Sequence, residues 1–167
     1  MSVAEIHEVD GGSPIGEIFS PSRAEAFEER FVDMLNGGAA CLMVSVGHRT
    51  GLFDALEDGA WVSSDALATR AGLDERYVRE WLGAMVTSGI VECDGQTTTY
   101  RLPSEHGACL TRAATPNNLA MFAQYIAELG SVEGDIVHCF EHGGGVPYER
   151  FGRFHEIMAE DSGQSVL

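Results

Sequence analysis

Two histidines and a glutamate that lie close together are the first residues to test for chemistry. They belong to the run His138-Cys139-Phe140-Glu141-His142. This run matches the H-x-x-E-H pattern, in which two histidines one helical turn apart bind zinc and the glutamate activates water. Such a site needs a further acidic ligand and ordered partners behind its ligands. Here the pattern abuts the triple glycine at 143–145, and a histidine near a helix C-terminus is favourable in any case. We therefore expect no metal site.

Other common signatures of catalysis and phosphate binding do not occur in the sequence. It contains neither G-x-G-x-x-G nor G-x-x-x-x-G-K-[ST], and it has no G-x-S-x-G that would present a nucleophilic serine. We interpret the glycines at 143–145 as a hinge. Tyr148, Phe151 and Phe154 follow them at helical spacing. This spacing is more typical of a core face than of a ligand cage.

The charge of the chain argues against nucleic acid as its main partner. The 167 residues carry a formal net charge of −16, and all ten basic residues are arginine. A protein that binds DNA gains most of its affinity by neutralising phosphates. Residues 60–112 hold five arginines against seven acidic side chains. Nucleic acid is therefore not an expected partner.

The cysteines and apolar segments predict a soluble, cytoplasmic protein without membrane association. Cys41, Cys93, Cys109 and Cys139 lie far apart, which favours reduced thiols packed as small core residues over a disulfide framework. The longest strongly apolar run, residues 39–46, is too short to span a bilayer. No leader pattern opens the chain.

Residues 62–102 predict a winged helix-turn-helix. Ser63 or Ser64 can cap a short helix that ends at Gly72, and Asp74 can cap a longer second helix directly after it. Two helices joined this closely are typical of a helix-turn-helix.

A β-hairpin is predicted to follow the second helix. Gly89 ends that helix, and residues 90–93 and 97–102 are rich in β-forming side chains. Asp94-Gly95 between them is a strong hairpin signal. This hairpin is the expected wing.

The second helix of this module has an apolar face and a charged face. Its apolar residues form one predicted buried stripe: Tyr77, Val78, Trp81, Leu82, Met85 and Val86. Arg76 and Arg79 face away, and a DNA-binding role would require one or both to reach bases or phosphates. Glu75 and Glu80 lie in the same region, and Asp94 is at the tip of the wing. The charge therefore favours a winged helix used for packing or dimerisation.

Further elements precede the winged helix. Residues 1–20 are predicted to be a flexible tail. An amphipathic helix follows from Arg23, and Asn36-Gly37-Gly38 is expected to interrupt it. Its apolar face is formed by Phe27, Phe31, Met34 and Leu35. A second helix then starts with residues 39–44, which are apolar on all sides. In so small a domain, a second subunit is the expected cover.

Helices are also expected after the wing, although residues 104–112 give no periodic signal. Thr115 and Pro116 are predicted to open a helix that Gly130 closes. Its stripe is Leu119, Phe122, Ile126 and Leu129. Another helix is predicted over about residues 132–142. The face of a last helix is formed by Tyr148, Phe151, Phe154, His155 and Met158.

Together these patterns predict a mainly α fold, in which a winged helix-turn-helix with a small β-hairpin wing is flanked by N-terminal and C-terminal helices. We divide the chain into a tail at 1–20, a helical dimerisation region with the winged helix at 21–112, and a helical linker or lid at 113–167.

Several runs of the sequence carry a resemblance to a known family. Residues 51–56 (GLFDAL), 64–68 (SDALA), 74–82 (DERYVREWL) and 89–92 (GIVE) form one block, and GGGVPY, RFHE and MAEDS between 143 and 162 form a second, more specific one. From about Arg23 onward the chain resembles the N-terminal region of bacterial class I S-adenosylmethionine (SAM)-dependent methyltransferases.

The resemblance implies a role for this region. In that family a winged-helix module commonly mediates dimerisation and helps roof the substrate pocket, whereas a following Rossmann-like domain binds SAM and catalyses methyl transfer. The sequence contains no apolar strand followed by an acidic residue and G-x-G. We therefore expect the catalytic domain to be absent and SAM not to be bound by this chain alone.

The resemblance also sets the expected function. We expect a homodimeric dimerisation and substrate-lid module that is not catalytic on its own, with a small-molecule methyl acceptor in the full-length protein. Because they follow the glycine hinge, the pocket candidates are Tyr148, Phe154, His155 and Glu156. The alternative is a winged-helix DNA-binding transcriptional regulator that uses Arg76 and Arg79.

Overall fold

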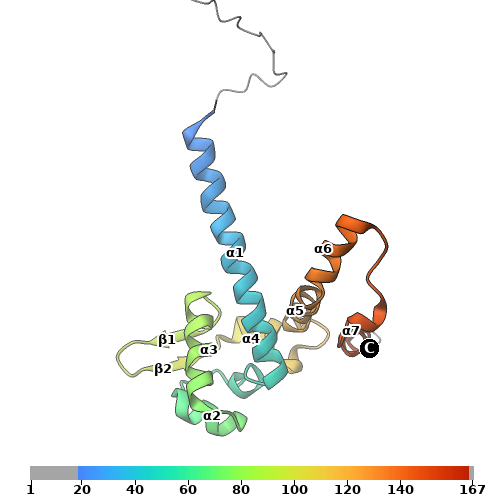
Figure 1. Cartoon of the computed structure of the whole chain (residues 1–167). Coiled ribbons are helices and arrows are strands. Elements are labelled where there is room, and N and C mark those ends of the chain that lie inside the picture. The colour runs from blue at the N-terminus through green and yellow to red at the C-terminus, as the bar shows by residue number, and fades with distance from the viewer. Residues whose placement is uncertain (1–18, 166–167) are drawn as a thin grey trace, which may run out of the picture.

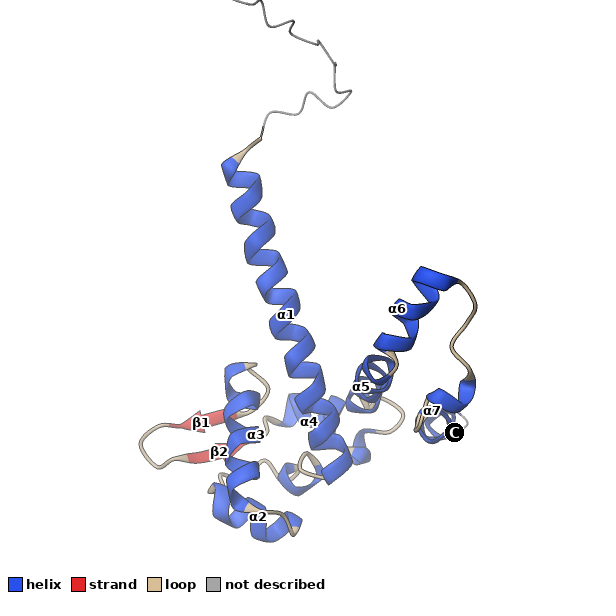
Figure 2. Cartoon of the chain, in the orientation of Figure 1, coloured by secondary structure: helices blue, strands red, loops and turns tan. Residues whose placement is uncertain are grey.

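The computed structural model describes residues 19–165, and helices dominate it (Figures 1 and 2). The tail predicted at 1–20 therefore lies, except for its last two residues, outside the described part. The helices are α1 (Pro21–Thr50), α2 (Ser64–Ala71), α3 (Glu75–Thr87), α4 (Ser104–Leu110), α5 (Ala123–Ser131), α6 (Glu133–His142) and α7 (Phe154–Ser165). Short 3-10 turns are η1 (Asp54–Leu56), η2 (Arg112–Ala114), η3 (Leu119–Phe122) and η4 (Tyr148–Arg150). The strands are β1 (Glu92–Asp94) and β2 (Thr99–Arg101).

Helix α1 is one continuous helix of 30 residues, so the predicted interruption at Asn36-Gly37-Gly38 is wrong. A glycine inside a helix costs about 1 kcal/mol relative to alanine. It keeps its backbone N–H, however, so the hydrogen-bond ladder continues through it. The helix ends at Gly51, whose left-handed conformation (φ 73°) caps it. The N-terminal half of α1 extends away from the other described elements, and every residue from 21 to 39 is exposed (Figure 1).

The helix-turn-helix forms as predicted. The Ser63 hydroxyl accepts a hydrogen bond from the Ala66 backbone N–H (3.2 Å) at the start of α2, which ends at a left-handed Gly72. The Asp74 carboxylate accepts one from the Arg76 N–H (3.0 Å) at the start of α3. These caps satisfy N–H groups that have no partner within the helix.

The buried stripe of α3 is narrower than predicted. Val78, Trp81, Leu82 and Met85 are buried, but Tyr77 is 73% exposed. Tyr77 lies at one edge of the stripe and half-buried Val86 at the other, because residues at helical spacing spread over a wide arc of the surface.

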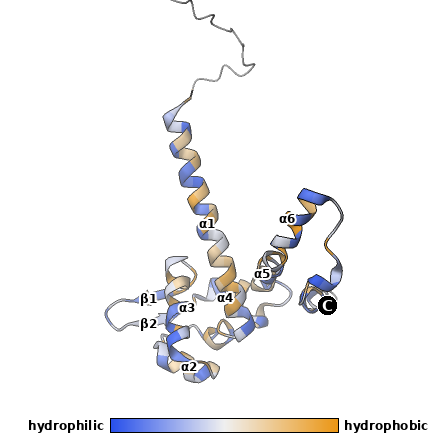
Figure 3. Cartoon of the chain, in the orientation of Figure 1, coloured by the Kyte–Doolittle hydropathy of each residue, from blue (hydrophilic) through white to orange (hydrophobic). Residues whose placement is uncertain are grey.

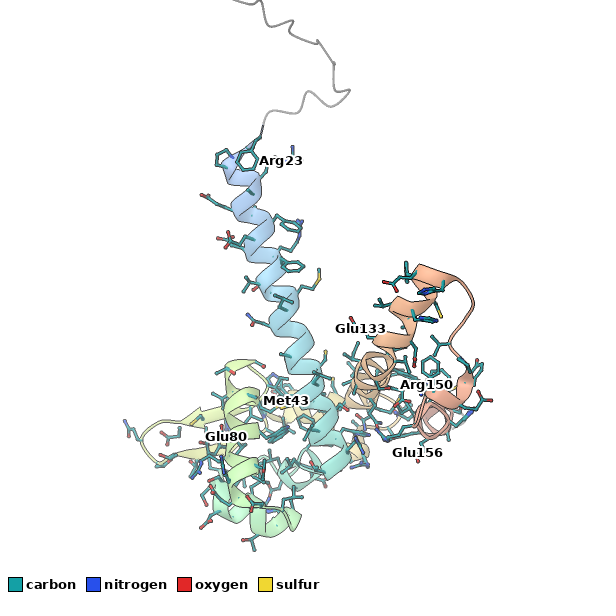
Figure 4. The ribbon with its side chains drawn as sticks, viewed as in Figure 1. Arg23, Met43, Glu80, Glu133, Arg150 and Glu156 are labelled. Atoms are coloured by element: carbon teal, nitrogen blue, oxygen red, sulfur yellow. The ribbon has the colours of Figure 1, made fainter. Side chains whose placement is uncertain are left out.

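Trp81 connects α3 to α1 at the centre of the core. Its ring packs edge-on against Phe53, with centroids 5.2 Å apart. Its indole N–H donates a hydrogen bond of 2.9 Å to the carbonyl of Met43. Met43, labelled in Figure 4, lies where α1 runs beside α3.

The wing is a two-stranded antiparallel hairpin, with shorter strands than the sequence predicted. Cys93 pairs with Tyr100, and Val62 bridges to Tyr100 on its other side. The turn begins at Asp94, as expected, but runs on to Thr98, whose φ is 52°. A hydrogen bond from the Gln96 backbone N–H to the Asp94 carboxylate lowers the pKa of Asp94 and orders this turn.

The elements after the wing differ from the prediction at two helix starts and in one missed helix. Helix α4 was not predicted, because its sequence has no apolar stripe. In the structure none of its residues is fully buried. Thr115 and Pro116 do not open a helix. Instead the Asn118 side chain caps η3, accepting a hydrogen bond of 3.1 Å from the Ala120 N–H. Helix α6 matches its prediction, whereas α7 begins at Phe154 and leaves Tyr148 in η4.

The prediction that the four cysteines are small core residues is wrong. Cys93 is exposed, and Cys41, Cys109 and Cys139 are half-buried; all four are free thiols.

Candidate functional site

The apolar stripe predicted over residues 119–129 faces solvent. Leu119, Phe122, Ile126 and Leu129 have exposed fractions between 46% and 58%. Helix α5 and η3 bury a different face, formed by Ala120, Met121, Ala123, Gln124 and Glu128. Apolar side chains gathered on one exposed face mark a contact surface.

Helix α1 carries a second exposed apolar face along its N-terminal half. Phe27 is 55% exposed and Phe31 45% exposed, and their rings stack with centroids 5.8 Å apart. Met34 and Leu35, predicted on the same face, are exposed as well. This part of α1 extends away from the other described elements (Figure 1), and within residues 19–165 these side chains are exposed.

The C-terminal half of α1 is apolar, as Figure 3 shows, but it is not buried on all sides within the chain. Val44 is 9% exposed, whereas Leu42 and Val46 are 43% and 41% exposed. Within residues 19–165, Leu42 and Val46 are therefore not fully covered. Cover by a second subunit stays a prediction.

An aromatic pocket lies between the end of α5 and the start of α7. Its volume is about 320 Å³. It is lined by Leu129, Val146, Tyr148, Phe151 and Phe154. Tyr148 is 67% exposed and the two phenylalanines are half-buried, so these rings form an open surface pocket more than a sealed core. An uncharged pocket of aromatic and aliphatic side chains can hold a flat apolar group.

The structure brings together three of the four predicted pocket residues. The Tyr148 ring lies 6.1 Å from Phe154 and 6.2 Å from His155, centroid to centroid. His155 is exposed and is not among the residues that line the pocket. Glu156 is 72% exposed and pairs with Arg153 at 3.2 Å, so it does not line the pocket. Figure 4 labels Arg150 in η4 and Glu156 in α7.

Sequence reasoning missed a polar cluster that joins α1, α5 and α7. His48 Nε2 lies 2.6 Å from Glu160 Oε1, and Gln124 Nε2 donates to Glu160 Oε2 at 2.8 Å. Arg153 donates from its guanidinium to Gln124 Oε1 and from its backbone N–H to Glu128 Oε1, both at 2.8 Å. We call these five residues the polar cluster. The signal in the sequence was the pair Gln124 and Glu128, which lie four residues apart on the face of α5 opposite its apolar stripe and could have indicated a polar contact there.

Glu160 is the half-buried carboxylate at the centre of these contacts. Burial by itself would raise its pKa, but hydrogen bonds from Gln124 and His48 outweigh burial and hold the pKa below its ordinary value. Arg112 adds a further favourable charge, and it also donates to the His48 carbonyl at 2.7 Å. The carboxylate is therefore ionised at neutral pH, which makes its hydrogen bonds charge-assisted.

The histidines of the H-x-x-E-H run do not gather further ligands. His138 and His142 stack with ring centroids 4.3 Å apart on α6. Within residues 19–165, no group of three or more His, Cys, Asp and Glu side chains is placed to hold a metal ion. In the same range, no helix is long and apolar enough to cross a membrane.

The exposed face of α3 carries both arginines of the DNA-binding alternative. Arg79 pairs with Glu75 at 3.4 Å. Arg76 is exposed, as is Glu80, which Figure 4 labels. Acidic neighbours thus offset part of the positive charge that phosphate contacts require.

A family model and several solved structures match the chain. The family model is described as an Rv2258c-like winged HTH domain and matches residues 38–112. Among solved structures, the mitomycin 7-O-methyltransferase MmcR has a TM-score of 0.65 at 18% identity, covering 87% of this chain and 46% of its own. The dimethyltransferase RosA from Streptomyces davawensis has a TM-score of 0.62 at 18% identity, with coverages of 86% and 44%.

A human protein has the same fold. Human N-acetylserotonin methyltransferase, solved in complex with SAM, has a TM-score of 0.60 at 17% identity and covers 90% of this chain and 44% of its own. The chain thus spans less than half the length of each of these proteins. No curated protein sequence matches it. Residues 38–112 thus match the model of an Rv2258c-like winged helix-turn-helix domain, and the chain shares its fold with part of each of these methyltransferases.

Proposed function

We propose that this chain is the dimerisation and substrate-lid module of a SAM-dependent small-molecule methyltransferase and that it is not catalytic on its own. The observation that carries the proposal is the pair of exposed apolar faces, on α1 and on η3 and α5, in a fold shared with methyltransferases. The homodimer, the lid and the methyl acceptor belong to this proposal.

The dimer accounts for the long exposed half of α1. A helix in water gains most of its stability from tertiary packing of its apolar face. Residues 21–39 make about five turns, at 3.6 residues per turn, without such packing against the rest of the described residues 19–165. A second copy that covers Phe27 and Phe31 with an apolar face of its own supplies the missing contacts. The α5 stripe is an apolar face of the required kind.

The described residues do not fit SAM. Within residues 19–165 the strands form a single two-stranded antiparallel sheet. A nucleotide-type cofactor is usually held where a glycine-rich turn joins a parallel strand to a helix. In the proposed function, a catalytic domain that works with this module binds SAM.

The lid role rests on the aromatic pocket. Tyr148, Phe151 and Phe154 can stack on a flat acceptor and orient it. His155, whose ring lies 6.2 Å from the Tyr148 ring, can hydrogen-bond to a polar group on an acceptor that extends beyond the pocket. Orientation is a large part of what a protein supplies to a displacement reaction. Glu156 remains a candidate only if the acceptor reaches beyond the pocket.

Two charge substitutions test the dimer. Phe31→Glu on α1 and Ile126→Glu on α5 each place a carboxylate on a proposed interface, and we expect each to convert a dimer into a monomer by light scattering. Phe140→Glu is the matched control, because Phe140 is 89% exposed on α6, outside both faces. A wild-type monomer, or interface variants that stay dimeric, would refute the proposal.

A further inference from the structure

We infer that the polar cluster is a latch: it holds α7 against α1 and α5 and so keeps the aromatic pocket formed. This inference rests on the proposed lid role and adds what fastens the lid. It also assigns a function to His48, Gln124 and Glu160, which lie outside the pocket itself.

Apolar packing alone holds α7 weakly. Of its described side chains, only Ile157 is buried. Phe154 is half-buried at the pocket, and most of the other positions are exposed. One buried isoleucine supplies little of the free energy needed to fix a helix of 12 residues. The docking of α7 therefore depends on its polar contacts.

These polar contacts fasten α7 at two places. At the start of α7, the buried Glu128 carboxylate accepts a hydrogen bond from the Arg153 backbone N–H, and the Gln124 side-chain oxygen accepts one from the Arg153 guanidinium. A carboxylate at this end of a helix is also favoured by the helix dipole. Farther along, Glu160 accepts from Gln124 and from His48, whose side chain is 2% exposed. Tyr125 adds a hydrogen bond of 3.2 Å to Asp161.

The contacts depend on one another, so the latch releases as a unit. Gln124 uses its amide N–H for Glu160 and its carbonyl oxygen for Arg153, which links the two fastening points. Losing one partner leaves another polar group buried without a hydrogen bond, and this is costly in a low-dielectric site.

Release of the latch would open the pocket on one side. Phe154 belongs to α7, but Tyr148 belongs to η4, which Arg150 fastens to Asp135 of α6 at 2.8 Å. If α7 leaves, Phe154 moves away while Tyr148 stays with α6. The pocket then loses the part of its lining that Phe154 provides.

Hydrogen exchange measured by mass spectrometry tests the latch. In Glu160→Gln, charge-assisted hydrogen bonds become neutral ones, and we expect the amides of residues 154–165 to exchange about fivefold faster. Glu149→Gln is the matched control: the same change at an exposed residue of η4, outside the cluster. We expect it to exchange like the wild type. Binding of the uncharged dye N-phenyl-1-naphthylamine should weaken only in Glu160→Gln.

The outcomes separate the latch from a general loss of fold and from the dimer. The amides of α3 should keep wild-type exchange in both variants. Equal exchange of α7 in wild type and Glu160→Gln would overturn the latch, and so would an equal acceleration in α3, since Glu160 would then support the whole fold. Arg153→Met removes the guanidinium hydrogen bond to Gln124 and leaves the backbone hydrogen bond to Glu128, and it should also speed the exchange of α7. A monomeric mass refutes the dimer without changing these readouts.

Discussion

Among the described glycines, Gly47 is the one where an added Cβ would meet its neighbours most closely. It lies buried in α1, and a Cβ there would come within 2.5 Å of Trp81 Cζ2 and 2.9 Å of Phe53 Cε2. The Trp81 ring cannot easily withdraw, because its N–H is bonded to the Met43 carbonyl. Overpacking a core destabilises a protein by about 1–3 kcal/mol, whereas alanine stabilises a helix by about 1 kcal/mol relative to glycine. With so short a contact, we expect Gly47→Ala to lower the free energy of unfolding by ~2 kcal/mol.

Gly38 provides the matched control on the same helix. A Cβ at Gly38 meets nothing within 4 Å. Gly38→Ala should therefore stabilise the protein by about 0.5–1 kcal/mol if α1 is continuous. Both substitutions reduce the entropy of the unfolded chain alike, so their difference isolates packing. Thermal unfolding followed by circular dichroism measures it, with a Tm about 4–8 °C below wild type for Gly47→Ala. A Gly47→Ala protein as stable as Gly38→Ala would refute the packing assigned to Trp81.

Two further predictions concern acid and the core. Because the folded-state pKa of Glu160 is lowered, its stabilising contribution is present above the ordinary pKa of about 4.5 and is lost as pH falls through the folded value. The groups that face Glu160 are His48, Arg112 and Gln124. In Glu160→Gln, the amide exchange rate of α7 should depend less on pH in the acid range than it does in the wild type. An unchanged pH dependence would contradict this. Trp81→Phe removes the hydrogen bond to Met43 and part of the ring, and should cost about 2–3 kcal/mol in urea unfolding. A loss below half a kcal/mol would argue against the central position of Trp81.

Local signals predicted the winged helix well. Caps at Ser63 and Asp74 and the left-handed Gly72 each depend on neighbouring residues, so the sequence specifies them directly. The wing was predicted because Asp94-Gly95 is a local turn signal, but this signal did not show that the turn runs to Thr98.

Features that depend on tertiary context were harder to predict. Asn36-Gly37-Gly38 weakens a helix locally, but the helix continues through it. The stripe of Leu119 and Ile126 was found, but periodicity cannot tell a core face from a contact surface. The pocket aromatics were recognised as a group, whereas Glu160 meets His48 from 112 positions away in the sequence, a pairing that no local pattern carries.

The most direct test of the account is a calorimetric titration of this chain with SAM, with light scattering on the same sample. We predict twice the chain mass of 18.0 kDa and no heat of SAM binding. This result would fit a dimerisation and lid module that leaves the cofactor to a catalytic domain. A monomer that binds SAM would contradict the account, because the cofactor site would then lie among these helices.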